Sequence, residues 1–358
     1  MFFSNLFMEN KNIEIIGAGL SGLLLAYYIF KITDKFNVTV YEKSSSIHKN
    51  KNFCFWLEKN KKFEFSELIL KNWNSWYFST PNDFVFHKSN LFEYVLLKND
   101  DLLSFILGEL NRFKNFEIIY DREIKRSDYN TGYVFDSRNV DRNNWKLSQI
   151  FVGYEIQTEY ENEDYVTLMG NMQYCPELKF NFNYILPLDN QSLFFEKTVF
   201  TIDDLNYELI EEQLKIELLS KYSSFDIKKI EYGCIPMGYY NEKLNNIGIP
   251  IGVRAGHYRS SSGYSFQTIN KNMKIYANKI CLGKSINKKP IHFQNIIDDH
   301  FLKTFIFNMD QFPNVFLNMS RKLKPNDFAK FMSSVNLLSL FPMIKALPKK
   351  IFLNSFML

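Results

Sequence analysis

The sequence has few of the residues that mark metalloproteins and disulfide-bonded proteins. Its 358 residues include only four cysteines and five histidines. The histidines have no metal-ligand spacing, and the cysteines lack the paired spacing of zinc sites or disulfide frameworks: Cys54, Cys175, Cys234 and Cys281. We therefore expect reduced cysteines in a cytoplasmic protein, and no metal site.

A strong charge bias and a membrane-spanning segment are also missing. The chain has 43 basic and 39 acidic residues, and its formal charge of +4 is too small to indicate nucleic-acid binding. No uninterrupted apolar run is long enough to cross a bilayer. Residues 1–10 lack the basic leader and small-residue cleavage site of a secretory signal. A cytoplasmic protein, soluble or peripheral to a membrane, is expected.

The length exceeds what one compact core usually holds, which predicts two intertwined lobes and a helical tail. The first lobe begins with a βαβ pattern. The run NIEII at Asn12–Ile16 predicts a buried strand, an apolar helix follows it, and a second strand is expected at Val38–Glu42. A parallel sheet with a nucleotide site at the first turn is the structure that this order favours.

The turn itself is GAGLSG, which places glycines where a dinucleotide fold requires them. Gly17 suits a tight turn, Gly19 the approach of backbone to pyrophosphate, and Gly22 close packing of helix on strand. The phosphates would lie at the positive end of the helix. Glu42 ends the second strand, where a carboxylate accepts the ribose hydroxyls and repels a 2′-phosphate. FAD or NAD is therefore favoured over NADP at this site.

The middle of the chain predicts a second lobe of different construction. Between Ile150 and Thr201 lie four stretches rich in β-branched and aromatic residues, separated by polar turns. Such spacing predicts an antiparallel sheet. A helix is expected within Asp203–Tyr222, and another at Thr268–Ala277.

A glycine- and serine-rich stretch, Ile249–Phe266, precedes the last of these helices. Gly252 and Gly256 would let backbone pass close to a ligand, and the amides around Ser262–Ser265, which include that of Gly263, would meet an isoalloxazine edge or a phosphate. Composition alone slightly favours an ordinary serine- and glycine-rich surface loop.

Several short motifs, in this order and spacing, resemble lycopene cyclases. The resemblance extends from Asn12 to Phe266. The motifs are GAGLSG (17–22), KNFCFW (51–56), VFDSR (134–138), QIFVGYEI (149–156), FNYILPL (182–188), LFFEKT (193–198), EYGCIPM (231–237) and GVRAGHYRSSSGYSF (252–266). The chain departs from the family's pattern at Gly170, where an acid is usual, and at Asn139, where a glycine is usual.

The resemblance implies an aromatic-hydroxylase-like flavoprotein fold. It further implies bound FAD, active in its reduced form with NADPH or NADH as reductant, and the closure of a linear end of lycopene or a related acyclic carotenoid. In that family the acid in the segment matching LFFEKT is assigned to catalysis, which is Glu196 here.

The chemistry of ring closure also suits Glu196, either as the proton donor or as the carboxylate that stabilises the cation and takes up the departing proton. Cyclisation must protonate an alkene, let a neighbouring alkene capture the cation, and remove a different proton. Strand alternation puts Phe194 and Thr198 on the face of Glu196 and directs Lys197 away. An apolar wall would raise the pKa of the acid; a half-exposed structural acid is the alternative. Three aromatic side chains are candidates for cation–π contact, with plain core packing as the favoured alternative for most of them: Phe151, Tyr184 and Phe195.

The C-terminal part predicts short helices broken by prolines. From residue 335 it joins apolar clusters to Lys345, Lys349 and Lys350, a pattern typical of a segment that lies in a membrane interface. A helical cap packed on the enzyme is the alternative.

We thus expect an α/β protein with three regions. A Rossmann-like FAD-binding lobe is assigned to residues 1–70, 100–148 and 230–285, an antiparallel β substrate lobe to 71–99 and 149–229, and a helical, membrane-associating region to 286–358. The function expected is a cyclase that converts linear ψ-ends into β-rings without net redox change. The alternatives are an FAD-dependent monooxygenase or prenyl reductase, and a non-catalytic carotenoid-binding protein.

Overall fold

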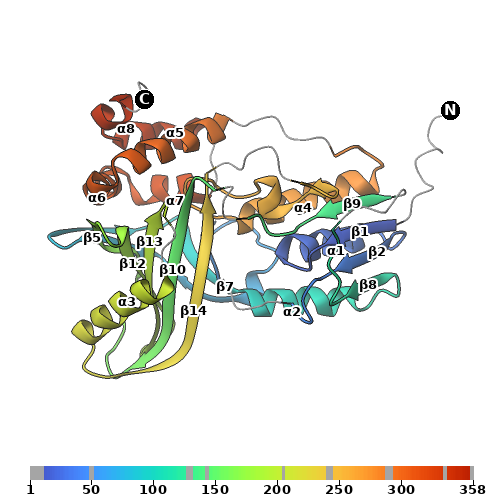
Figure 1. Ribbon diagram of the computed structural model, residues 1–358, viewed down its shortest axis with the longest axis horizontal. Coiled ribbons are helices and arrows are strands. Elements are labelled where there is room, and N and C mark those ends of the chain that lie inside the picture. Colours follow the sequence, from blue (N-terminus) through green and yellow to red (C-terminus); the bar gives the residue numbers. More distant parts are fainter. Residues whose placement is uncertain are drawn as a thin grey trace. The chain divides into compact units, whose positions relative to one another are not determined.

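The computed structural model describes residues 12–47, 52–125, 132–141, 145–203, 206–238, 245–286, 293–333 and 337–354 (Figure 1). Contacts within the chain define two compact units, and each is discontinuous in the sequence. Unit 1 is formed by Met1–Phe53, Lys98–Asn144 and Tyr239–Ile291. Unit 2 is formed by Cys54–Leu97, Trp145–Gly238 and His292–Leu358.

Unit 1 is built on a five-stranded sheet in the order β15-β9-β1-β2-β8, and every neighbouring pair is parallel. Helix α1 packs against both α2 and α4. The strands are β1 (Asn12–Ile16), β2 (Asn37–Tyr41), β8 (Phe116–Ile119), β9 (Tyr133–Asp136) and β15 (Ile249–Pro250), and the helices are α1 (Leu20–Ile32), α2 (Asn99–Leu110) and α4 (Phe266–Cys281).

The βαβ unit forms where the sequence predicts it. Ile13 and Ile15 of β1 are completely buried, and α1 is buried from Ser21 to Phe30. A helix that is apolar on all sides requires cover on all sides, which the sheet, α2 and α4 supply. The prediction of a Rossmann-like parallel sheet is confirmed.

Unit 2 contains a seven-stranded sheet in the order β14-β10-β13-β12-β11-β5-β6. The predicted antiparallel pairing across 150–201 is confirmed. One pair, β11 with β5, is parallel, which the local pattern did not indicate because β5 comes from a distant part of the chain. The strands are β5 (Ser75–Thr80), β6 (Asp83–Lys88), β10 (Leu147–Thr158), β11 (Val166–Cys175), β12 (Lys179–Pro187), β13 (Ser192–Thr201) and β14 (Phe225–Met237).

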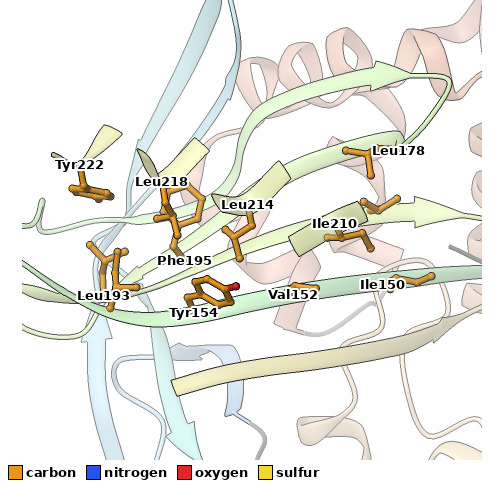
Figure 2. Close-up of a cluster of buried hydrophobic side chains, with 12 residues drawn as sticks. Ile150, Val152, Tyr154, Leu178, Leu193, Phe195, Ile210, Leu214, Leu218 and Tyr222 are labelled. Carbon is orange, nitrogen blue, oxygen red and sulfur yellow. The ribbon is translucent and has the colours of Figure 1, made fainter. Parts of the chain in front are cut away.

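One face of this sheet is covered by helix α3 (Tyr207–Lys221), which begins after its N-cap residue Asn206. Figure 2 shows the apolar side chains of α3 directed at those of β10 and β13. The helix supplies Ile210, Leu214 and Leu218, and the strands supply Ile150, Val152, Tyr154, Leu193, Phe195 and Val199. Alternate residues of β13 therefore belong to this α3 face, and the residues between them belong to the opposite face.

The C-terminal helices belong to unit 2. They are α5 (Phe293–Phe307), α6 (Phe312–Lys322), α7 (Pro325–Ser333), α8 (Leu337–Ala346) and α9 (Lys349–Asn354). Phe305 of α5 packs against Phe180 and Phe200, with ring centroids 5.3 and 5.6 Å apart. His87 of β6 lies with Nε2 2.8 Å from the Ser320 carbonyl oxygen, which ties α6 to the sheet.

A second, three-stranded sheet has the order β3-β7-β4, formed by Asn52–Glu58, Phe92–Lys98 and Ile69–Trp73. Residues 54–70 and 230–238 lie in unit 2, whereas the sequence assigned them to the FAD-binding lobe. Residues 292–358 also belong to unit 2, where α6 contacts β5, β6 and β11 of the seven-stranded sheet.

Candidate functional site

The glycine turn of unit 1 has the conformation that its residues require. Gly17 has φ +103°, a value that residues with side chains rarely adopt, and its N–H donates to the Tyr41 carbonyl over 2.7 Å. A Cβ on Gly22 would lie 2.2 Å from the carbonyl oxygen of Gly17. Both glycines are therefore needed to pack α1 closely against the sheet.

Gly19 and Glu42 complete this turn. A Cβ built on Gly19 would meet no atom within 4 Å, so this glycine borders open space at the start of α1. Glu42 accepts hydrogen bonds from the backbone N–H of Ala18 at 2.9 Å and of Ser44 at 3.1 Å. The acid at the end of β2 is thus brought to the glycine turn.

The two glycines at the start of the 249–266 stretch have different surroundings. Gly252 has φ +66°, and a Cβ there would lie 2.0 Å from the Ser21 hydroxyl oxygen, so this glycine packs the stretch against α1. Gly256 has φ +70° and faces open space. His257 Nδ1 accepts from the Gly252 N–H at 3.2 Å and so holds the turn between them.

Two of the amides expected to meet a ligand form hydrogen bonds within the stretch. The N–H groups of Ser262 and Gly263 donate to the Arg259 carbonyl, at 3.2 and 2.7 Å. The Ser262 hydroxyl is buried and has no hydrogen-bond partner among the described residues. If this stretch contacts a cofactor, the hydroxyl and not these two amides is the group available.

A buried ionic cluster beside the glycine turn was missed in the sequence. Asp136 is completely buried at the end of β9 and pairs with Arg138 at 2.7 Å and Arg254 at 3.1 Å. Burial opposes its charge, but the bonds from Arg138 and from the Ile247 N–H, with the charge of Arg254, hold the pKa of Asp136 below its ordinary value. The VFDSR motif contains Asp136 and Arg138, but Arg254, the other arginine of the cluster, lies far along the chain.

The residues of unit 1 fit a dinucleotide. Gly19 and Gly256 border space that a side chain would fill, and Ser262 presents an unsatisfied buried hydroxyl. Glu42 is fixed at the end of β2 by backbone donors, and each of its oxygens retains a lone pair for a ribose hydroxyl.

In unit 2, Glu196 is a buried acid with no basic partner among the residues that the structure describes. It is 7% exposed on β13, and the Thr198 hydroxyl donates to its Oε1 at 2.5 Å. Burial raises the pKa of Glu196 to about 8, helped by the negative charge of Glu231 and opposed by the Thr198 hydrogen bond. Glu196 is therefore largely protonated at neutral pH.

Two tyrosines and a cysteine gather beside Glu196. Tyr184 is paired with Glu196 in the sheet register, and its hydroxyl lies 2.9 Å from that of Tyr94. Cys54 of β3 hydrogen-bonds with both tyrosines, and burial raises the pKa of its thiol to about 12. The three-stranded sheet thus supplies two side chains, Cys54 and Tyr94, that local sequence reasoning did not associate with Glu196.

Phenylalanine rings line the Glu196 face. A Cβ on Gly153 would lie 2.2 Å from the Phe194 ring, and one on Gly233 would lie 2.1 Å from the Phe151 ring. Each glycine therefore makes room for a ring from the neighbouring strand. Phe151 and Tyr184 share the face of Glu196, but Phe195 does not. Phe195 therefore has the alternative role, core packing, because strand alternation places it on the α3 face.

Glu231 was not selected from the sequence. Its partner in the sheet is Gly153, which also pairs with Glu196 on the other side, so the two acids lie on one face. Lys229 Nζ lies 2.8 Å from Glu231 Oε1. The EYGCIPM motif contains Glu231, but only the pairing of β14 with β10 brings it to Glu196.

The described residues contain no group of three or more histidine, cysteine, aspartate or glutamate side chains placed to hold a metal ion. At Gly170, where an acid is usual in lycopene cyclases, a Cβ would lie 2.5 Å from the Thr167 methyl carbon. An acidic side chain has no room there unless Thr167 moves.

Comparison with solved structures defines the class of fold. A geranylgeranyl bacteriochlorophyll reductase-like protein of Thermoplasma acidophilum has a TM-score of 0.61 at 11% identity, over 96% of this chain and 98% of that one. A flavin-dependent brominase has a TM-score of 0.58 at 12% identity, over 97% and 98%. The p-nitrophenol 4-monooxygenase of Pseudomonas putida has 0.56 at 10%, over 97% of each chain. The fold is that of aromatic-hydroxylase and halogenase-type flavoproteins.

The family follows from the sequence. Residues 121–310, more than half of the chain, match the model of the lycopene cyclase protein family, and the chain belongs to this family. Residues 15–48 match the model of an NAD(P)-binding Rossmann-like domain. No curated protein matches the chain.

Proposed function

We propose that this protein is a carotenoid cyclase that converts linear ψ-ends into β-rings without net oxidation or reduction. The observation that carries the proposal is Glu196, a buried carboxyl group that retains its proton near neutral pH on a face lined by aromatic rings. Membership of the lycopene cyclase family supports a carotenoid as substrate. Such an acid suits the protonation of an alkene, which needs a proton donor in a dry environment.

The residues would act in a simple order. The Glu196 carboxyl group donates its proton to the terminal alkene, and Thr198, which donates a hydrogen bond to Oε1, stabilises the carboxylate left behind. The rings of Phe194 and Phe151 stabilise the cation that results by cation–π contact. The neighbouring alkene then captures the cation, and loss of another proton completes the ring.

The cofactor proposed is FAD, bound by Gly17, Gly19, Gly22 and Glu42, with the open position at Gly256 and the hydroxyl of Ser262 in the stretch that includes Gly252 and Gly263. Reduced FAD would supply an electron-rich group that stabilises a cation without net electron transfer. Replacing Gly19 by Val should abolish flavin binding, because the side chain would fill the open space at the start of α1. Equal flavin absorbance in purified variant and parent would contradict this site.

The reductant proposed is NADPH or NADH, required only to reduce the flavin. Chemically reduced enzyme under anaerobic conditions should therefore cyclise lycopene without nicotinamide, because the product is an isomer of the substrate. Nicotinamide oxidation that matches product one for one would favour a monooxygenase or a prenyl reductase.

Expression in cells that accumulate lycopene, followed by pigment chromatography and mass determination, is the main test. A cyclic product of unchanged mass is expected. A product of changed mass would indicate redox chemistry, and bound but unchanged lycopene would indicate a carotenoid-binding protein without activity.

The C-terminal helices are proposed to associate with a membrane surface. No helix in the described part of the chain is long and apolar enough to cross a bilayer. On α8 and α9, Phe341, Ile344 and Leu353 are 72%, 51% and 61% exposed, close in sequence to three exposed lysines, whereas Leu340 and Met343 are buried. Exposed apolar residues with lysines suit an interfacial helix.

Because part of this segment is buried, substitution is a sharper test than removal of residues 335–358. Phe341→Ser with Ile344→Ser should reduce sedimentation with vesicles of phosphatidylglycerol and phosphatidylcholine, while flavin content stays unchanged. Leu219→Ser, at an exposed leucine of α3, is the matched control. Unchanged sedimentation of the double variant would contradict the proposal.

A further inference from the structure

Glu196 and Glu231, which share one face of the sheet with Glu155, have opposite electrostatic surroundings. Glu196 interacts with a hydroxyl group and the negative charge of Glu231, and both its burial and that charge favour the protonated form. Glu231 instead forms an ion pair with Lys229, whose Nζ lies 2.8 Å from Glu231 Oε1. Where two acids have environments that separate their protonation states, one suits the donor and the other the acceptor of a proton.

Their spacing follows from the strand register. Gly153 of β10 pairs with Glu196 on one side and with Glu231 on the other. Because neighbouring strands lie about 4.8 Å apart, the Cα atoms of the two glutamates are about 10 Å apart across the sheet. The Phe194 ring covers Gly153 and so lies between them. A cation held over that ring would have a carboxyl group on either side.

We infer that Glu231 is the base that removes the proton which completes the ring, and that Glu196 is the acid which starts the reaction. The inference rests on the proposed cyclase function and adds a second catalytic residue to it. Cyclisation needs both roles, and Glu231 is the second carboxyl group beside the Phe194 ring.

The atoms balance without another reactant. The Glu196 O–H bond breaks, and its proton forms a C–H bond with the terminal alkene. The second alkene then forms the carbon–carbon bond of the ring. A C–H bond beside the new cation breaks, its proton goes to Glu231, and its electron pair becomes the ring double bond. Glu231 then releases its proton to solvent, and solvent returns a proton to Glu196, so the enzyme is regenerated and substrate and product are isomers.

Glu231→Gln separates the two proton transfers in deuterated water. The variant retains Glu196, so it should still deuterate the alkene. The cation cannot lose its ring proton to Glu231 and instead returns a hydrogen to Glu196. Cyclic product should fall by roughly 10²- to 10⁴-fold, whereas lycopene recovered from the reaction should contain deuterium. Glu196→Gln should give neither product nor deuterated lycopene.

Asp226→Asn is the matched control, because Asp226 is an exposed, ion-paired carboxylate on the same strand. It should leave product formation unchanged. Flavin content and urea unfolding, measured for every variant, report on the fold.

Two outcomes would overturn the inference. One is a Glu231→Gln variant that forms product within about threefold of the parent rate, against the factor expected of a general base. The other is a folded, flavin-containing variant that loses both product and deuterium exchange, which would make Glu231 a positioning residue for Glu196. If the parent protein forms no cyclic carotenoid, the proposed function itself fails, and this result is distinct from both.

Discussion

Glu196 and Lys197 are adjacent in β13 and both are buried, but they lie on opposite faces of the sheet and have different partners. Lys197 is completely buried on the α3 face, where its Nζ lies 2.7 Å from Glu217 Oε1 and 3.3 Å from Asn183 Oδ1. Glu196, on the opposite face, accepts a hydrogen bond from the Thr198 hydroxyl and is subject to the electrostatic repulsion of Glu231.

Lys197 therefore has the surroundings of a structural charge, whereas Glu196 has those of a group suited to proton transfer. A buried charge that is paired and hydrogen-bonded is compatible with a stable core. A buried acid near a second acid is destabilised in its charged form, so it keeps its proton, and such perturbed groups are concentrated at functional sites. The two faces therefore predict different consequences for changes at neighbouring positions.

The largest effect is expected at Glu196. Glu196→Gln keeps the volume and hydrogen-bonding capacity but cannot donate a proton, so cyclisation should fall by roughly 10²- to 10⁴-fold with fold and flavin retained. Glu196→Asp should be intermediate, because the carboxyl group is withdrawn from the alkene. Pigment analysis in lycopene-accumulating cells, with protein level and flavin content in parallel, checks both. Near-parental product from the Gln variant would make Glu196 a structural residue like Lys197.

Lys197→Met should have the opposite effect: it should lower the stability of the fold and leave catalysis unchanged. Removing the ammonium leaves Glu217 and Asn183 without their charged partner inside the α3 face, which should lower the free energy of unfolding by up to about 3–5 kcal/mol. Cyclisation per folded molecule should be unchanged. Urea unfolding and specific activity measure the two quantities. The double variant Lys197→Met with Glu217→Leu should recover much of the stability, because no unpaired charge remains. A loss of specific activity at full stability would contradict the comparison.

The pH dependence should follow Glu196. Its pKa of about 8 lies above that of an unfolded glutamate, so the folded state binds more protons between about pH 4.5 and 8. Its contribution to stability is present below about pH 4.5 and is lost as the pH rises through about 8. Activity should fall about tenfold per pH unit above that value, since the proton donor is lost.

Glu196→Gln should remove this stability dependence. At pH 8 the variant should be more stable than the parent by at least about 1 kcal/mol, because each pKa unit corresponds to about 1.36 kcal/mol. Urea unfolding of both proteins from pH 5 to 9 is the measurement. Parallel curves for the two proteins would mean that the carboxyl group is not held protonated by the fold.

The smallest effects are expected at the two phenylalanines that precede these residues. Phe194→Leu should slow cyclisation several-fold, since a cation–π contact is worth about 0.5–2 kcal/mol. It should also cost about 1 kcal/mol of stability, because the Phe194 side chain is buried. Phe195→Leu should cost about 1 kcal/mol of stability on the α3 face and leave the rate unchanged. The cyclisation rate and the urea unfolding of both variants measure these effects. Equal effects on rate would remove the distinction between the two faces.

Much of the fold could be predicted because its patterns are local. The strand at Asn12–Ile16 has the predicted bounds, and α1 begins at Leu20 directly after Gly19. Helix α4 is longer than expected, from Phe266 to Cys281. The parallel pairing of β11 with β5 and the cover that α6 gives the sheet were not predicted, because both depend on segments far apart in the chain.

The sequence by itself determined the glycine turn with Glu42, and the alternation that separates Glu196 from Lys197. These features depend on residues a few positions apart, and strand geometry alone assigns alternate side chains to opposite faces. Only the tertiary structure decided what surrounds Glu196. The pairing of β10 with both β13 and β14 brings Glu231 to its face, and the three-stranded sheet brings Cys54 and Tyr94. The protonation state of a buried acid depends on these distant groups, because burial and nearby charge are properties of the packed fold.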